Sequence, residues 1–168
     1  MKKNNVVLIG MPGVGKSSAG VVLAKVLGYE FVDSDLVIQK EEKRLLKEII
    51  ATEGLDEFIR IENRVNANLN VNNCVIATGG SVIYGKEAME HLSEIGVIVY
   101  LRATFDTIDS RLGNLEGRGV AIKSNQTLFD LYQERTILYE KYADAIVDLD
   151  GCSISATVVE IERILQKI

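Results

Sequence analysis

The sequence is short of three residue types that would each permit a particular chemistry: it has two cysteines, one histidine and one proline in 168 residues. Cys74 and Cys152 form no CxxC pair, and no other cysteine or histidine lies near His91 at the spacing of metal ligands. We expect Cys74 to be a core residue and His91 to lie on the surface of a helix. These absences argue against a zinc site, and the thiol usage indicates a reducing environment.

Long apolar runs and basic runs are also missing. No stretch approaches the roughly 18 apolar residues of a membrane span, and the polar N-terminus is followed by only four apolar residues, too few for a signal peptide. The net charge of −5 is a poor match for general nucleic-acid binding. We therefore expect a soluble cytoplasmic monomer that binds neither nucleic acid nor membrane, in which a local basic pocket can still take a small anion.

The residues that are present alternate between two patterns. Short apolar, β-branched runs predict buried strands at Val6–Ile9, Phe31–Val32, Cys74–Ala77, Val97–Leu101 and Ala145–Val147. Helical spacing predicts helices from the residues after Gly15 to Gly28, over 36–50 and 55–69 with a break near Gly54, and over 127–142 and 155–168. This alternation predicts one α/β domain, a three-layer α/β/α fold around a five-stranded parallel sheet.

The strongest motif is G-x-x-x-x-G-K-S at residues 10–17, placed after an apolar strand and before an amphipathic helix. Glycines let backbone N–H groups turn toward phosphate oxygens, and the helix N-terminus adds its positive dipole end. Lys16 places a charge on the β- and γ-phosphates, and Ser17 offers a hydroxyl to Mg²⁺. The predicted contacts of a nucleoside triphosphate are Gly13, Val14, Gly15, Lys16, Ser17 and Ser18.

Two carboxylates, Asp33 and Asp35, follow the second predicted strand, at the edge where ligands of parallel sheets bind. One can hold Mg²⁺ and the other can accept a proton from an attacking hydroxyl. Asp and Ser also cap helices well, so an N-cap is the alternative, and both can hold at once.

Two further segments are weaker signals. Gly79 and Gly80 follow the third strand, where paired glycines let a ligand approach the backbone or simply form a turn. Residues 113–125 join two helices, and a connection of that length is typical of a lid, with a plain loop as the alternative. Arg118 lies in this segment and could reach the transferring phosphoryl group.

With these residues in place, the chain resembles the shikimate kinase family, within the nucleoside monophosphate kinase-like P-loop fold. The similarity covers nearly the whole chain. It is carried by residues 10–17, Asp33-Ser34-Asp35, Glu53-Gly54 through Phe58 and Glu62, Thr78-Gly79-Gly80, Arg111 and Arg118, Glu134-Arg135, Leu138-Tyr139 and Tyr142-Ala143-Asp144.

The resemblance implies ATP-dependent phosphorylation of a hydroxyl of a small carboxylated polyol, shikimate first of all, with Mg²⁺ as cofactor. Asp35 would hold the acceptor hydroxyl and act as base, and Asp33 would lie near Mg²⁺. Residues 34–70 would form acceptor-binding helices. Gly79 and Gly80 would line the acceptor site, Arg135 would grip the acceptor carboxylate, Arg111 would stack on adenine and Arg118 would belong to the lid.

The chain departs from the family pattern on the acceptor side. Ile59 occupies the position of an arginine that also grips the carboxylate, and Arg60, one residue later, is turned about 100° around the helix. We expect Arg60 to compensate in part. Ser81 replaces the third glycine, and Gly119 replaces a lid proline. Alternatives are therefore a kinase for a gluconate-like or nucleotide acceptor, and a nucleotide-binding module without kinase activity.

Overall fold

The structure, a computed structural model, describes residues 3–112, 120 and 122–168. At its centre is a five-stranded parallel sheet in the order β2-β3-β1-β4-β5. The strands are β1 (Asn5–Ile9), β2 (Glu30–Asp33), β3 (Cys74–Ala77), β4 (Gly96–Arg102) and β5 (Ala145–Asp148). All five predicted strands are confirmed, each within one residue at either end.

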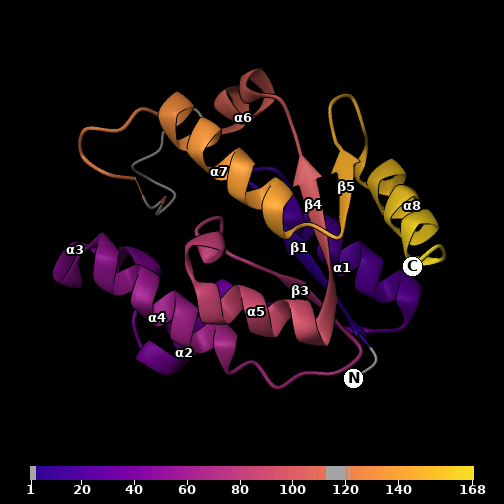
Figure 1. Cartoon of the computed structure of the whole chain (residues 1–168), viewed down its shortest axis with the longest axis horizontal. Helices are drawn as coiled ribbons and strands as arrows, with labels where there is room; N and C mark the ends of the chain where they lie inside the picture. The colour runs from indigo at the N-terminus through magenta and orange to yellow at the C-terminus, as the bar shows by residue number, and fades with distance from the viewer. Residues whose placement is uncertain (1–2, 113–119, 121) are drawn as a thin grey trace.

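Helices cover both faces of this sheet (Figure 1). α1 (Lys16–Leu27) and α8 (Ile154–Leu165) pack together on one face, and α5 (Lys86–Ile95) and α7 (Leu128–Tyr142) contact β4 from the other. The remaining helical segments are α2 (Ser34–Glu42), α3 (Leu46–Glu53), α4 (Leu55–Ala67), the 3₁₀ turn η1 (Val82–Tyr84) and α6 (Phe105–Leu112). The predicted three-layer α/β/α fold is confirmed.

One predicted helix was wrong. Residues 36–50 form two helices, α2 and α3, because the chain turns at Lys43, which has a left-handed φ of 55°. The charged run at 41–44 offers no apolar side chain to bury, so nothing holds a continuous helix against the core there. The Glu48 side chain accepts a hydrogen bond from the Leu45 N–H and starts the second helix.

The helices α2, α3 and α4 have a small core of their own, apart from the main core around the sheet. Its buried residues are Ile38, Ile49, Phe58, Ile61 and Val65. We call this cluster the second core. It fixes α2 and α4 relative to each other, and the side chains on the inner faces of these two helices are therefore held in place beside the edge of the sheet.

The segments with predicted functions meet at the carboxyl edge of the sheet. Asp33 and Leu8 are both paired with Ala77, so β2, β3 and β1 end side by side. β1 leads into the glycine-rich loop, β2 into α2, and β3 into Thr78 and Gly79. In the described part of the chain no helix is long and apolar enough to cross a membrane.

Candidate active site

The glycine-rich loop joins β1 to α1 and adopts a conformation that only glycine takes without strain at two positions. Gly13 has φ 76° and Gly15 φ 105°. The Val14 N–H donates to the Met11 carbonyl oxygen over 3.3 Å and closes the turn. The first turn of α1 contains no acidic residue. Its free N–H groups and dipole therefore favour an anion.

Lys16 lies inside this loop, with a side chain that is almost fully buried. Its ammonium donates to the carbonyl oxygens of Gly10 and Met11 over 2.8 and 2.9 Å. Burial lowers the pKa of Lys16 to about 8, with the charge of Asp35 opposing that shift. The side chain is thus still cationic near pH 7 and is pre-positioned beside the loop that would hold phosphates.

The N-cap alternative for the Asp33 and Asp35 pair is confirmed for Asp33. Asp33 is the N-cap of α2, where it accepts from the Asp35 N–H over 3.0 Å, and its other oxygen accepts from the Ser17 hydroxyl over 2.9 Å. Asp35 lies in the first turn of α2 and is half-buried. Burial, and then the charge of Asp33, raise the pKa of Asp35 to about 6.

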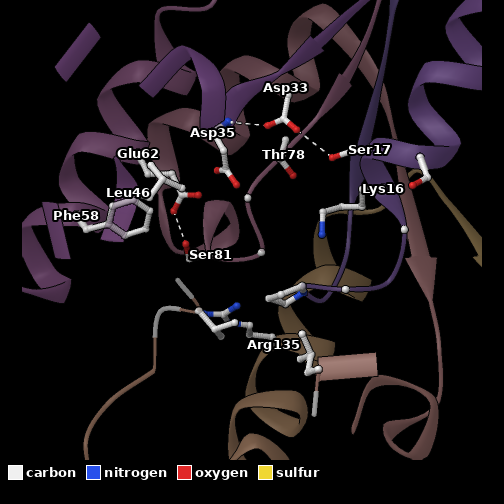
Figure 2. A pocket seen from close by; sticks show the side chains of 18 residues that line it. Lys16, Ser17, Asp33, Asp35, Leu46, Phe58, Glu62, Thr78, Ser81 and Arg135 are labelled. Carbon is white, nitrogen blue, oxygen red and sulfur yellow. Dashed lines mark hydrogen bonds between the residues drawn. The ribbon is translucent and has the colours of Figure 1, made fainter. Parts of the chain in front are cut away.

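These side chains surround a cavity of about 420 Å³, which we call the main cavity because it brings them together and which is within the size range of small-molecule sites. Figure 2 shows Lys16, Asp35, Glu62 and Arg135 around it, each reaching in from a different element. The cavity is lined by Pro12, Gly13, Gly15, Lys16, Ser17, Ser18, Asp33, Asp35, Leu46, Phe58, Glu62, Thr78, Gly79, Gly80, Ser81, Leu112, Val120 and Arg135.

Arg135 belongs to α7, and its long side chain is 1% exposed. Its guanidinium lies over the ring of Tyr84, 5.5 Å from the centroid. A Cβ at Gly80 would lie 2.8 Å from Pro12 Cδ and 2.9 Å from Arg135 Nη1, so a side chain there would collide with both. The backbone of Gly80 is also held by the Tyr139 hydroxyl, which donates to its carbonyl oxygen over 2.6 Å.

A side cavity of about 300 Å³ shares Gly13, Gly15 and Ser18 with the main cavity. Arg111, from the end of α6, lines it and donates from Nη1 to the Val14 carbonyl oxygen over 3.0 Å. The other lining residues are Val14, Ala19, Leu149, Cys152, Ile154 and Thr157. The loop thus separates a charged space from a more apolar one.

Among the predicted site residues that the structure describes, Arg60 lines neither cavity. The Arg60 side chain is 74% exposed and pairs with Glu57, so the structure gives no support to Arg60 as a replacement for the family arginine. Ile59 packs against the second core instead of lining the main cavity. Arg118 and Gly119 lie outside the described residues.

Glu62 is the cavity residue that the sequence signalled without our assigning it a role. It is 1% exposed, on the buried face of α4, and its Oε2 accepts from the Ser81 hydroxyl over 2.5 Å. Burial raises the pKa of Glu62 to about 7, and the Ser81 hydrogen bond opposes this shift. The signal was available: Glu62 lies within the apolar stripe that contains Phe58, Ile61 and Val65, where a carboxylate is unexpected.

Residues 12–166 match the family model described as shikimate kinase. The chain belongs to the shikimate kinase family. The shikimate kinase of Thermodesulfovibrio yellowstonii is 39% identical over 88% of this chain and 86% of its own length. That of Clostridium botulinum is 32% identical over 97% of this chain and 98% of its own length.

Solved structures of shikimate kinases agree with this family assignment. The enzyme from Acinetobacter baumannii in complex with shikimate superposes with a TM-score of 0.90 at 28% identity, covering 99% of this chain and 94% of that one. The Aquifex aeolicus shikimate kinase gives 0.82 at 27% identity, covering 96% of each chain. As a shikimate kinase family member, the protein is a small-molecule kinase, and the phosphate donor of this family is ATP.

Proposed function

We propose that this protein transfers the γ-phosphoryl group of ATP to a hydroxyl of shikimate, giving shikimate 3-phosphate and ADP. The observation that carries the proposal is the main cavity itself. It places the phosphate-binding loop with Lys16, the carboxylate of Asp35 and the guanidinium of Arg135 around one space. A relative with the same fold is solved with shikimate bound, which supports this choice of acceptor.

On the donor side, the loop N–H groups and Lys16 hold the phosphates. Gly13, Val14, Gly15 and Ser18 continue from the main cavity toward the side cavity, where Arg111 would stack on the adenine. Ser17 and Asp33 present a hydroxyl and a carboxylate 2.9 Å apart, and hard oxygen donors of this kind fit Mg²⁺. When bound, Mg²⁺ neutralises charge that develops on the β- and γ-phosphates.

On the acceptor side, Arg135 binds the carboxylate of shikimate, and the backbone of Gly79 and Gly80 allows the ring to approach closely. Asp35 orients the reacting hydroxyl and accepts its proton while the hydroxyl oxygen forms a bond to the γ-phosphorus and the bond to the ADP oxygen breaks. Lys16 offsets the charge of the phosphoryl group in transit. Residues 113–125, with Arg118, stay our predicted lid, which would exclude water as a competing acceptor.

An assay of ADP release tests the proposal, with shikimate, quinate, gluconate and nucleoside monophosphates as acceptors and ATP binding measured by calorimetry. We expect turnover with shikimate well above the rate without acceptor. Absence of that turnover would overturn shikimate as the acceptor. ATP binding without product from any acceptor would point to a nucleotide-binding module. A cytoplasmic location and a monomeric state remain predictions, and gel filtration with light scattering tests the second.

A further inference from the structure

The wall of the main cavity formed by α4 carries a carboxyl group that is only half satisfied. Glu62 Oε2 accepts the Ser81 hydroxyl, whereas the buried Oε1 has no hydrogen-bond partner. A buried carboxyl oxygen without a donor is costly, so the arrangement favours a ligand that supplies one.

A second carboxyl oxygen lies at the same spot. Asp35 Oδ1 is also buried without a hydrogen-bond partner. A Cβ placed on Gly79 would overlap both Glu62 Oε1 and Asp35 Oδ1, so the two oxygens converge on the bare backbone of this glycine. Figure 2 shows Asp35 and Glu62 on the same side of the cavity, together with the hydrogen bond that Ser81 donates to Glu62. Two converging acceptor atoms suit two donors on neighbouring atoms of one ligand.

Ser81 fixes which oxygen of Glu62 faces the cavity. The residue is buried, and it is the N-cap of the short turn η1. A hydroxyl that donates to Oε2 leaves Oε1 with its acceptor capacity intact. The neighbour Ile59, one helical turn before Glu62, is apolar and packs into the second core, so it provides no donor for this carboxyl group.

We infer that Ser81 is a positioning residue that holds Glu62 as a second acceptor-binding carboxyl group, and that Glu62 and Asp35 together bind two adjacent hydroxyl groups of the acceptor. The site therefore selects vicinal diols. This inference deepens the proposed function and rests on it: the hydroxyl on Asp35 is the one phosphorylated, and the hydroxyl on Glu62 is its neighbour.

If Glu62 binds a hydroxyl group of the acceptor, the KM for that acceptor depends on the protonation state of Glu62. Its pKa is raised by burial and by Asp35, and lowered by the Ser81 hydrogen bond and by the charges of Arg135 and Lys16. Removal of the Ser81 hydroxyl therefore raises the pKa further. Since the ionised carboxylate is the stronger acceptor, the KM for a diol rises as Glu62 is protonated, and the Ser81→Ala variant shows this rise at a higher pH than the wild type.

The test pairs two acceptors with four proteins. The acceptors are shikimate and 4-deoxyshikimate, which lacks the hydroxyl next to the one phosphorylated. The proteins are the wild type, Glu62→Gln, Ser81→Ala and the control Asn66→Ala, a buried residue one turn further along α4 that does not line the cavity. We expect the missing hydroxyl to raise KM about tenfold or more in the wild type and control, and less than about threefold in Glu62→Gln. Equal penalties in all four proteins overturn the inference.

A binding measurement separates this inference from the proposed function. The ¹³C carboxyl resonance of Glu62, identified by its loss in Glu62→Gln, is followed while shikimate, quinate or gluconate is added in the presence of ADP. If shikimate is not phosphorylated but another of these polyols shifts the resonance, shikimate is rejected as the acceptor and the inference about Glu62 stands. If none of them shifts it, the inference falls even where turnover persists. Should Glu62→Gln not fold, the pH at which KM rises in Ser81→Ala decides.

Discussion

The donor half and the acceptor half of the site are built in different ways. The donor half is one contiguous loop between β1 and α1, which offers backbone N–H groups, two left-handed glycines and one lysine to the phosphates that we propose it binds. The acceptor half is assembled from side chains of α2, α4 and α7 and the segment after β3. Backbone contacts tolerate sequence change, whereas a converging set of side chains is altered by a single substitution. The departures from the family pattern at Ile59 and Ser81 accordingly fall in the acceptor half.

Loss of Lys16, in the donor half, should have the largest effect on activity. We expect Lys16→Ala to lower kcat by about 1000-fold or more and to weaken ATP binding, because the buried ammonium is the charge nearest the phosphates in the loop. Lys25→Ala, an exposed position in the last turn of the same helix, is the control and should retain full activity. Steady-state kinetics and calorimetry give both quantities. A near-normal kcat in Lys16→Ala would show that the lysine of the loop takes no part in phosphoryl transfer.

Asp35→Asn should separate the two halves. We expect kcat to fall by about 100-fold or more, since a proton acceptor is lost, while the Kd for ATP changes little. Asp56→Asn, at an exposed position in the first turn of α4, is the matched control. If ATP affinity falls as much as turnover, Asp35 supports the loop structurally and does not act on the acceptor.

Glu62 links the acceptor half to stability. Its pKa is raised from 4.5 to about 7, so between these pH values the folded protein holds a proton that the unfolded chain releases. The free energy of unfolding therefore falls by up to about 3 kcal/mol as pH rises through this window. Above the window, Glu62 causes no further change in it. In Glu62→Gln the slope should become shallower, and what is left comes in part from Asp35, whose pKa is also raised. Urea unfolding at pH 5 and pH 8 measures it, and identical pH dependence in both proteins would show that Glu62 does not titrate there.

The fold was predictable from the sequence because each of its strands is a short apolar run. A parallel strand that is buried on both faces can be recognised from such a run alone, without knowing which strand it pairs with. The donor half was predictable for a related reason: its residues are consecutive, so their spacing alone specifies the geometry. The failed prediction, one helix over 36–50, came from charged residues whose periodicity resembles a helix although they bury nothing.

The acceptor half was only partly predictable. Asp35, Gly79, Gly80 and Arg135 were named and do line the cavity, yet the convergence of Glu62 and Asp35 was not foreseen. It depends on how α2 and α4 pack over the second core, which joins residues that are distant in sequence. We had expected Arg60 to compensate in part for the family arginine that Ile59 replaces, because the two residues are adjacent in sequence. A helix turns about 100° per residue, and that rotation sends Arg60 to solvent.

Ile59→Arg would make the acceptor half more like that of the family pattern. Ile59 and Glu62 are three residues apart on one helix, so a guanidinium there reaches the α4 wall of the cavity. We expect the KM for shikimate to fall about tenfold, the value of one charged hydrogen bond to a carboxylate. Ile59→Lys, which has the charge without the planar fork, should give a smaller gain. An unchanged KM with lower stability would mean that Ile59 serves only the second core.

Arg60→Ala should have the smallest effect. Its side chain is 74% exposed, and its ion pair with Glu57 is of the surface type that contributes about 1 kcal/mol or less. We expect KM and kcat with shikimate to change by less than about twofold, whereas Arg135→Ala, which removes the buried arginine of the same cavity, should raise KM about tenfold or more. Measured side by side, the two variants ask whether burial in the cavity or nearness in sequence to Phe58 determines which arginine binds the acceptor. A large effect of Arg60→Ala would require α4 to rotate or shift when the acceptor binds.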